Sequence, residues 1–113
     1  MDIAGDNYEM ASLPTTPLTA EQYLRIERLA KTRSEFHNGQ MFAMAGGSIN
    51  HSLLAGSAGA LLDRHAPSGC RVFNSDLRIH VPLSVLYTYA DCGVVGGEPQ
   101  LFGDQKDCLH PDL

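Results

Sequence analysis

The 113-residue chain has no long apolar run and no excess of positive charge. No segment approaches the length of a membrane span, and the first residues lack the basic and apolar regions of a signal peptide. A formal net charge of −5 argues against a generally basic nucleic-acid binder, although it leaves room for a local basic patch. The length and composition predict one folded domain with a modest hydrophobic core.

Cysteine is scarce as well. Cys70, Cys92 and Cys108 are widely spaced, odd in number and form no Cys-x-x-Cys pair. This pattern favours reduced thiols in a cytoplasmic protein over a disulfide framework or a zinc site. Cys70 and Cys92 are expected to serve as small hydrophobic residues of a core.

The apolar pattern predicts the order αββαβββ, which is an α+β domain with a mixed sheet. Residues 1–18 are polar and show no sustained period, so we expect a mobile leader ahead of a domain at residues 19–113. A helix begins at Thr19, where Gln22 completes a capping box. Glu27 is expected on the solvated face of this packing helix.

The next two elements are a hairpin and a second helix. Asn38-Gly39 predicts the type I′ turn of a β-hairpin over residues 35–45, because both central positions of that turn need positive φ. The second helix is predicted from about Ile49 to about His65. Its leucines and its small residues form two sets: Leu53, Leu54, Leu61 and Leu62, and Ala55, Gly56, Gly59 and Ala60. A helical glycine costs about 1 kcal/mol relative to alanine, so the small set predicts close approach to a sheet or to a second chain.

Two stretches predict strands that carry polar side chains. In residues 77–81 the apolar positions alternate with Arg78 and His80, which are expected to point outward from a half-buried strand. Residues 86–98 predict one strand, with Asp91 in its middle, followed by a polar loop. Burying a charge is costly unless it is paired, hydrogen-bonded or bound to a metal. Asp91 is therefore the first functional candidate, and an aspartate satisfied by backbone amides at a strand end is the equal alternative.

Three further polar residues stand out from the scaffold. Glu35 opens the first strand, His51 lies in the first turn of the second helix, and Asp76 lies between two strands. Each has a structural alternative: a surface strand end, an exposed helix residue, and a turn residue that bonds its own backbone. No P-loop, Gly-x-Gly-x-x-Gly, His-Glu-x-x-His or Gly-x-Ser-x-Gly motif accompanies them.

Four segments closely resemble the Uma2 family (the DUF820 group), in order and at matching spacing. They are residues 19–24, residues 33–48 with His51 after them, residues 70–78 and residues 86–99. The resemblance covers residues 18–113. It implies a restriction-endonuclease-like fold of the PD-(D/E)xK nuclease superfamily, with a mixed sheet flanked by helices, and metal-dependent hydrolysis of DNA.

The resemblance also implies roles for the four candidates. Asp91 corresponds to the aspartate of the "PD" position and would bind Mg²⁺ or Mn²⁺, with Glu35 as an outer ligand or a water-orienting group. His51 would contact phosphate or assist proton transfer, and Asp76 corresponds to the aspartate before the central strand. Arg78 and the neighbouring His80 would neutralise phosphate charge. The alternative is that both are exposed residues without a functional role.

The chain departs from the family pattern at two places. Ala90 stands where a proline is usual, and the sequence stops at Leu113, before the strand that carries the (D/E)xK half-motif. We therefore expect the chain alone to bind metal weakly and to be inactive or nearly so. The unpaired sheet edge and the small helix face predict a homodimer, and a non-catalytic dimerising module is the rival function. A small-molecule or other metal-binding enzyme is a third alternative.

Overall fold

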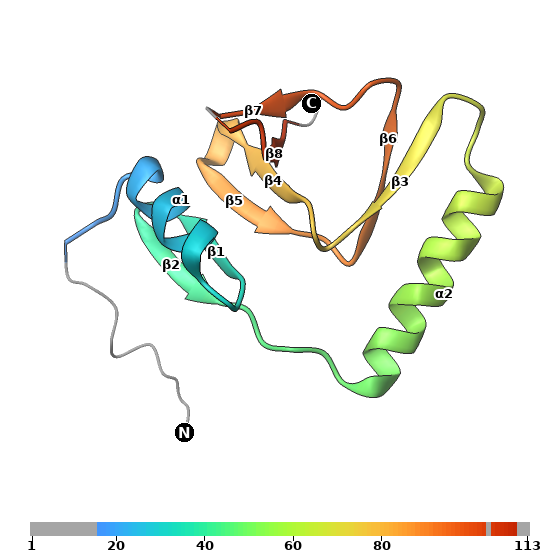
Figure 1. The fold of residues 1–113 in the computed structure, drawn as a ribbon, viewed down its shortest axis with the longest axis horizontal. Helices are drawn as coiled ribbons and strands as arrows, with labels where there is room; N and C mark the ends of the chain where they lie inside the picture. The colour runs from blue at the N-terminus through green and yellow to red at the C-terminus, as the bar shows by residue number, and fades with distance from the viewer. Residues whose placement is uncertain (1–15, 104, 111–113) are drawn as a thin grey trace. The chain divides into compact units, whose positions relative to one another are not determined.

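The computed structural model describes residues 16–103 and 105–110. They fall into two compact units, Met1–Met44 and Ala45–Leu113, which are described separately (Figure 1). Most of the predicted leader, residues 1–15, lies outside the described residues, as do residues 111–113 at the end of the sequence. Leu18, the last residue of that predicted leader, donates its backbone N–H to the carbonyl of Gly39 at 2.9 Å.

The first unit contains a helix and a hairpin: α1 (Ala20–Leu29), β1 (Ser34–His37) and β2 (Gln40–Ala43). Helix α1 begins with the predicted capping box, in which the Thr19 hydroxyl accepts from the Gln22 N–H and the Gln22 side chain accepts from the Thr19 N–H. β1 and β2 pair antiparallel on either side of Asn38-Gly39, whose φ angles are 56° and 82°. The predicted helix start and hairpin turn are confirmed.

The core of the first unit lies between α1 and the hairpin. The rings of Tyr23 and Phe36 stack with centroids 4.9 Å apart, and the Tyr23 hydroxyl donates to the Ser34 carbonyl at 2.6 Å. Glu27 is only 5% exposed, and its carboxylate accepts from the Ser34 N–H at 2.8 Å. The prediction that Glu27 lies on the solvated face is wrong, because this residue ties the helix to the start of β1.

The second unit contains one α-helix, one 3₁₀ turn and six strands within the described residues. These are α2 (Ile49–His65), β3 (Cys70–Asn74), β4 (Arg78–Val81), η2 (Pro82–Ser84), β5 (Leu86–Tyr89), β6 (Cys92–Gly96), β7 (Leu101–Phe102) and β8 (Cys108–Leu109). β3 and β6 pair antiparallel. β4 pairs antiparallel with β5 and parallel with β8, and β7 pairs antiparallel with β8. The predicted α+β class with a mixed sheet is confirmed.

The strand predicted over residues 86–98 is two strands. β5 ends at Tyr89 and β6 begins at Cys92, and each pairs with a different partner strand. Asp91 lies at the bend between them and is exposed, so its predicted position inside a buried strand is wrong. Aspartate is depleted in strands, which fits a break at this position. The segment predicted as a polar loop after Gly97 contains β7 and β8, which are too short to show a hydrophobic period.

β4 has the predicted period of two but buries the opposite face. Arg78 and His80 are buried, while Ile79 and Val81 are half-buried. The Arg78 guanidinium forms an ion pair with Asp107 at 2.9 Å and donates from Nε to the Tyr89 hydroxyl at 3.0 Å. The prediction that Arg78 and His80 point outward to contact phosphate is therefore wrong, since both are enclosed by neighbouring strands.

Helix α2 begins and ends where the sequence predicted, with the Ser48 hydroxyl accepting from the His51 N–H at 3.0 Å. None of its residues is buried, and its four leucines are between 37% and 70% exposed. Apart from its chain neighbours and the nearby backbone of α2, a Cβ added at Gly56 or Gly59 would meet no atom within 4 Å. The predicted close packing of these glycines therefore does not occur among the described residues. No described helix is long and apolar enough to cross a membrane.

Candidate functional site

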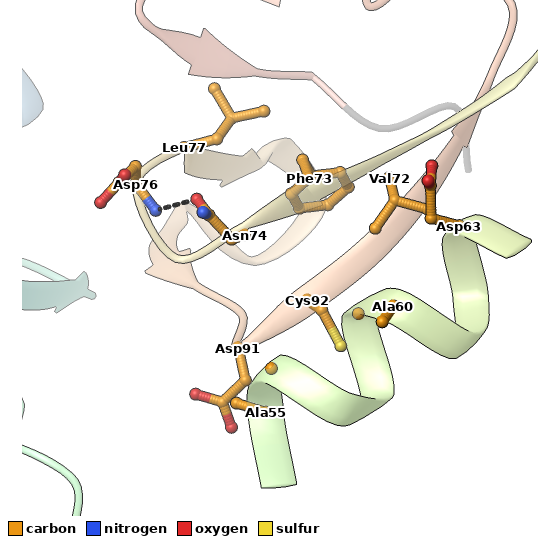
Figure 2. Close-up of a pocket in the computed structure, with 12 residues that line it drawn as sticks. Ala55, Ala60, Asp63, Val72, Phe73, Asn74, Asp76, Leu77, Asp91 and Cys92 are labelled. Carbon is orange, nitrogen blue, oxygen red and sulfur yellow. Dashed lines mark hydrogen bonds between the residues drawn. The ribbon is translucent and has the colours of Figure 1, made fainter. Parts of the chain in front are cut away.

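A cavity of about 590 Å³ lies between α2 and the β3–β6 pair (Figure 2). Small residues of α2 form one wall, and residues of the two strands and of the turn after β3 form the other. The lining residues are Ala55, Gly56, Gly59, Ala60, Asp63, Val72, Phe73, Asn74, Asp76, Leu77, Asp91 and Cys92. The small face of α2 thus leaves room for a cavity instead of closing against the strands.

Two of the predicted carboxylates lie at the same end of the β3–β6 ladder. The last pair of that ladder joins Asn74 to Cys92, so Asp76 and Asp91 both lie just beyond it. Asp76 is held in a tight turn in which its N–H donates to the Asn74 side-chain oxygen at 2.9 Å. Both aspartates line the cavity, because the antiparallel register returns the chain to this end.

The third candidate comes from α2. His51 Nε2 lies 3.0 Å from Asp91 Oδ1, and the two side chains are 51% and 60% exposed. The Ser48 cap fixes the His51 backbone, and the ring lies against Gly47, where an added Cβ would be 2.7 Å from His51 Cδ2. The glycine before the helix is therefore what leaves space for this histidine.

Glu35 belongs to the first unit. It is half-buried on β1 and lies opposite Phe42 in the hairpin. In the second unit Asp76 and Asp91 both line the cavity, and His51 contacts Asp91. Glu35 lies on the hairpin of the first unit.

Two carboxylates, those of Asp76 and Asp91, line this end of the cavity. Mg²⁺ is commonly held by one or two carboxylates together with water and substrate phosphate. Asp91 and Asp76 supply that type of ligand, so the chemistry of the site fits a weakly held divalent ion. Within residues 16–103 and 105–110, no group of three or more His, Cys, Asp or Glu residues is arranged to hold a metal.

The comparison with protein families identifies the chain. Residues 20–113 match the Uma2 family, which is described as "Putative restriction endonuclease". The chain belongs to the Uma2 family. The match covers both described units and includes all four candidate residues, so the predicted membership and the restriction-endonuclease-like class of the fold are confirmed.

Relatives of this Uma2 chain include two proteins of Synechocystis sp. "Uncharacterized protein slr1290" is 37% identical over 84 residues, which are 74% of this chain and 44% of that protein. "Uncharacterized protein sll1609" is 35% identical over 106 residues, which are 92% of this chain and 60% of that protein. The chain thus spans about half the length of these curated relatives. No solved structure gives a significant match.

The structure adds two polar cavity residues, Asp63 and Asn74, that were not among the candidates from the sequence. Asp63 lines the cavity from α2 and lies along the same face as Gly59 and Ala60, so helical spacing from the small set is a signal that points to it. Asn74 shapes the turn that holds Asp76. Asp63 lies well along α2 from the end of the helix that is near Asp91, as Figure 2 shows.

Proposed function

We propose that this Uma2 chain carries part of the active site of a metal-dependent DNA endonuclease. The contact of 3.0 Å between His51 and Asp91, beside Asp76 at the end of the cavity, supports this proposal. In this proposal His51 would move a proton beside the Asp91 carboxylate, which would hold the metal. Family membership supports the nuclease chemistry.

Each residue has a defined part in the proposed reaction. Asp91 and Asp76 would hold Mg²⁺ or Mn²⁺. A bound divalent ion would supply a more acidic water and a counter-charge for the departing oxygen. When Nε2 of His51 carries the proton, it would donate to Asp91 Oδ1 over the observed 3.0 Å and orient the carboxylate, and the same ring could exchange a proton with water or phosphate.

The chain by itself is proposed to be nearly inactive. Two carboxylates are a minimal ligand set for Mg²⁺, so we expect a dissociation constant on the order of millimolar. Asp63, Asp76 and Asp91 also line the cavity with negative charge, which repels a DNA phosphate until a cation is bound.

The test uses the 113-residue chain in two measurements. Calorimetric Mn²⁺ titration should show weak binding that Asp91→Asn reduces by roughly tenfold or more. Asp63→Asn removes the same charge elsewhere in the cavity and should have a smaller effect. Plasmid nicking with Mg²⁺ or Mn²⁺ should stay at background.

The two measurements separate the two parts of the proposal. Equal Mn²⁺ binding by the wild type and Asp91→Asn would remove Asp91 from the metal site. Nicking that disappears in Asp91→Asn would establish nuclease activity and overturn the inactivity of the chain alone.

Homodimerisation is the second candidate function, and the exposed leucines of α2 favour it. Leu54 and Leu61 are 70% and 51% exposed and are seven residues apart, which places them on one helix face. Light scattering after size exclusion should give twice the chain mass, and lysine at Leu54 and Leu61 should give a monomer. Leu83→Lys, at a leucine outside α2, is the control and should leave the dimer intact. A wild-type monomer at high concentration would exclude this interface.

A further inference from the structure

Two histidines lie close together beside the strands β4, β8 and β7, and neither of them lines the cavity that contains Asp76 and Asp91, here called the carboxylate cavity. His80 lies on β4, and His110 follows β8 directly. Their ring centroids are 5.8 Å apart, and the ring planes are tilted by 41°. Phe102 of β7 stacks against both rings, with centroid distances of 4.1 Å to His80 and 5.6 Å to His110.

The strand register explains why these two rings meet. β4 and β8 run parallel, with Arg78 opposite Cys108 and Ile79 opposite Leu109. Continuing this register by one residue places His80 opposite His110, so both side chains project from the same face. The His110 N–H donates to the Gln100 carbonyl at 2.7 Å, which fixes the backbone at this point.

Both rings have a buried nitrogen that lacks a hydrogen-bond partner. The Nδ1 atoms of His80 and His110 are buried, and neither has a partner within the described residues. His80 is 7% exposed, whereas His110 is half-buried. A buried polar atom without a partner is destabilising, so native structures rarely leave one unused. Two such atoms on neighbouring imidazoles indicate a shared ligand.

The ring separation suits a metal ion between the two imidazoles. Zinc lies about 2.0–2.1 Å from an imidazole nitrogen, which puts two ligating ring centroids roughly 5–6.5 Å apart for bond angles from tetrahedral to linear. The observed 5.8 Å falls within this range. Imidazole is a ligand for zinc, copper and nickel, whereas Mg²⁺ prefers oxygen, so such a site differs in chemistry from the carboxylate cavity.

We propose that His80 and His110 form a two-imidazole site for a transition-metal ion, with Zn²⁺ as the reference. No third His, Cys, Asp or Glu joins them among residues 16–103 and 105–110, so exchangeable ligands such as water complete the coordination. The half-buried His110 gives access from solvent. Because His110 follows β8, the metal joins this short strand to β4 and stabilises the β4–β8 pairing.

The experiment titrates the chelator-treated 113-residue chain with ZnCl₂ by calorimetry. We expect one Zn²⁺ per chain, with affinity reduced at least about tenfold in His80→Phe and in His110→Phe, since each removes one of two ligands. Phenylalanine keeps an aromatic ring in the stack. His65→Phe, at an exposed histidine of α2 that has no part in either proposed site, should bind Zn²⁺ as the wild type does.

A second measurement checks that the variants are folded. Far-UV circular dichroism tests whether each variant is folded, and Zn²⁺ should raise the thermal midpoint of the wild type but not of the two site variants. If His80→Phe does not fold, Zn²⁺ binding by His110→Phe, at the less buried position, decides whether the proposed site exists. Absence of saturable Zn²⁺ binding by the wild type, or unchanged binding by a folded site variant, overturns the proposal.

Discussion

Among single residues, His80 has an environment that penalises its charged form. Burial, and then the nearby His110, lower the pKa of His80 below its ordinary value of 6.5. The unfolded chain therefore binds this proton more readily than the folded chain does. The stability from a neutral His80 is present above pH 6.5 and is lost as the pH falls from 6.5 through the lower folded-state pKa.

Urea unfolding in the presence of a chelator measures this pH dependence. The free energy of unfolding of the wild type should decrease as the pH falls below 6.5, and His80→Phe should show a smaller decrease. Groups that do not interact with His80 contribute equally to both proteins, so the difference between them reports His80 together with its coupling to His110. Parallel pH profiles for the two proteins would contradict the prediction.

Glu27 provides a second test at the residue scale. Its buried carboxylate accepts from the Ser34 N–H at 2.8 Å, and Glu27→Ala removes that partner. We expect a loss of about 1–3 kcal/mol in the free energy of unfolding. Glu21→Ala, on the exposed face of the same helix, should cost about 0.5 kcal/mol or less. Equal losses in urea unfolding would show that Glu27 is an ordinary surface residue.

Among the elements, α2 combines an open small face with exposed leucines. Gly56 and Gly59 have helical backbones and open space around an added Cβ. Gly56→Ala and Gly59→Ala should each raise the free energy of unfolding by about 0.5–1 kcal/mol, because alanine forms helices better than glycine. Thermal or urea unfolding measures the change.

Gly93 is the contrasting position. A Cβ at Gly93 would collide with the ring of Phe73, so Gly93→Ala should destabilise the β3–β6 pair. If alanine at Gly56 or Gly59 instead lowers the free energy of unfolding, another part of the chain or a second chain packs against the small face of α2 in solution.

For the whole molecule, negative charge makes DNA binding depend on a divalent cation. The chain carries a formal net charge of −5, and the cavity is lined by Asp63, Asp76 and Asp91. Fluorescence anisotropy with a labelled duplex should show binding in Mn²⁺ that weakens about tenfold or more in EDTA, which corresponds to about 1.4 kcal/mol. Asp91→Asn should reduce the Mn²⁺ effect. Equal binding in EDTA would place the DNA on a basic surface elsewhere.

Local chemistry made several features predictable from the sequence. The Thr19 and Gln22 capping box and the Asn38-Gly39 turn depend on atoms within a few residues, so both appear where predicted. Helix α2 likewise keeps its predicted bounds because capping and helical spacing are local signals. Family membership was also predictable, because four sequence segments resemble the Uma2 family, and it is confirmed over residues 20–113.

Contacts between distant residues decided what the sequence did not predict. Arg78 is buried because Asp107, 29 residues away, supplies a carboxylate, and periodicity cannot show such a partner. The strand register likewise brings Asp76 and Asp91 to one end of the cavity, where His51 reaches Asp91. The sequence by itself determined the local elements and the candidate residues, because those depend on neighbouring backbone and side-chain chemistry. Only the tertiary structure decided which faces are buried and which candidates meet, because burial and convergence depend on strand pairing.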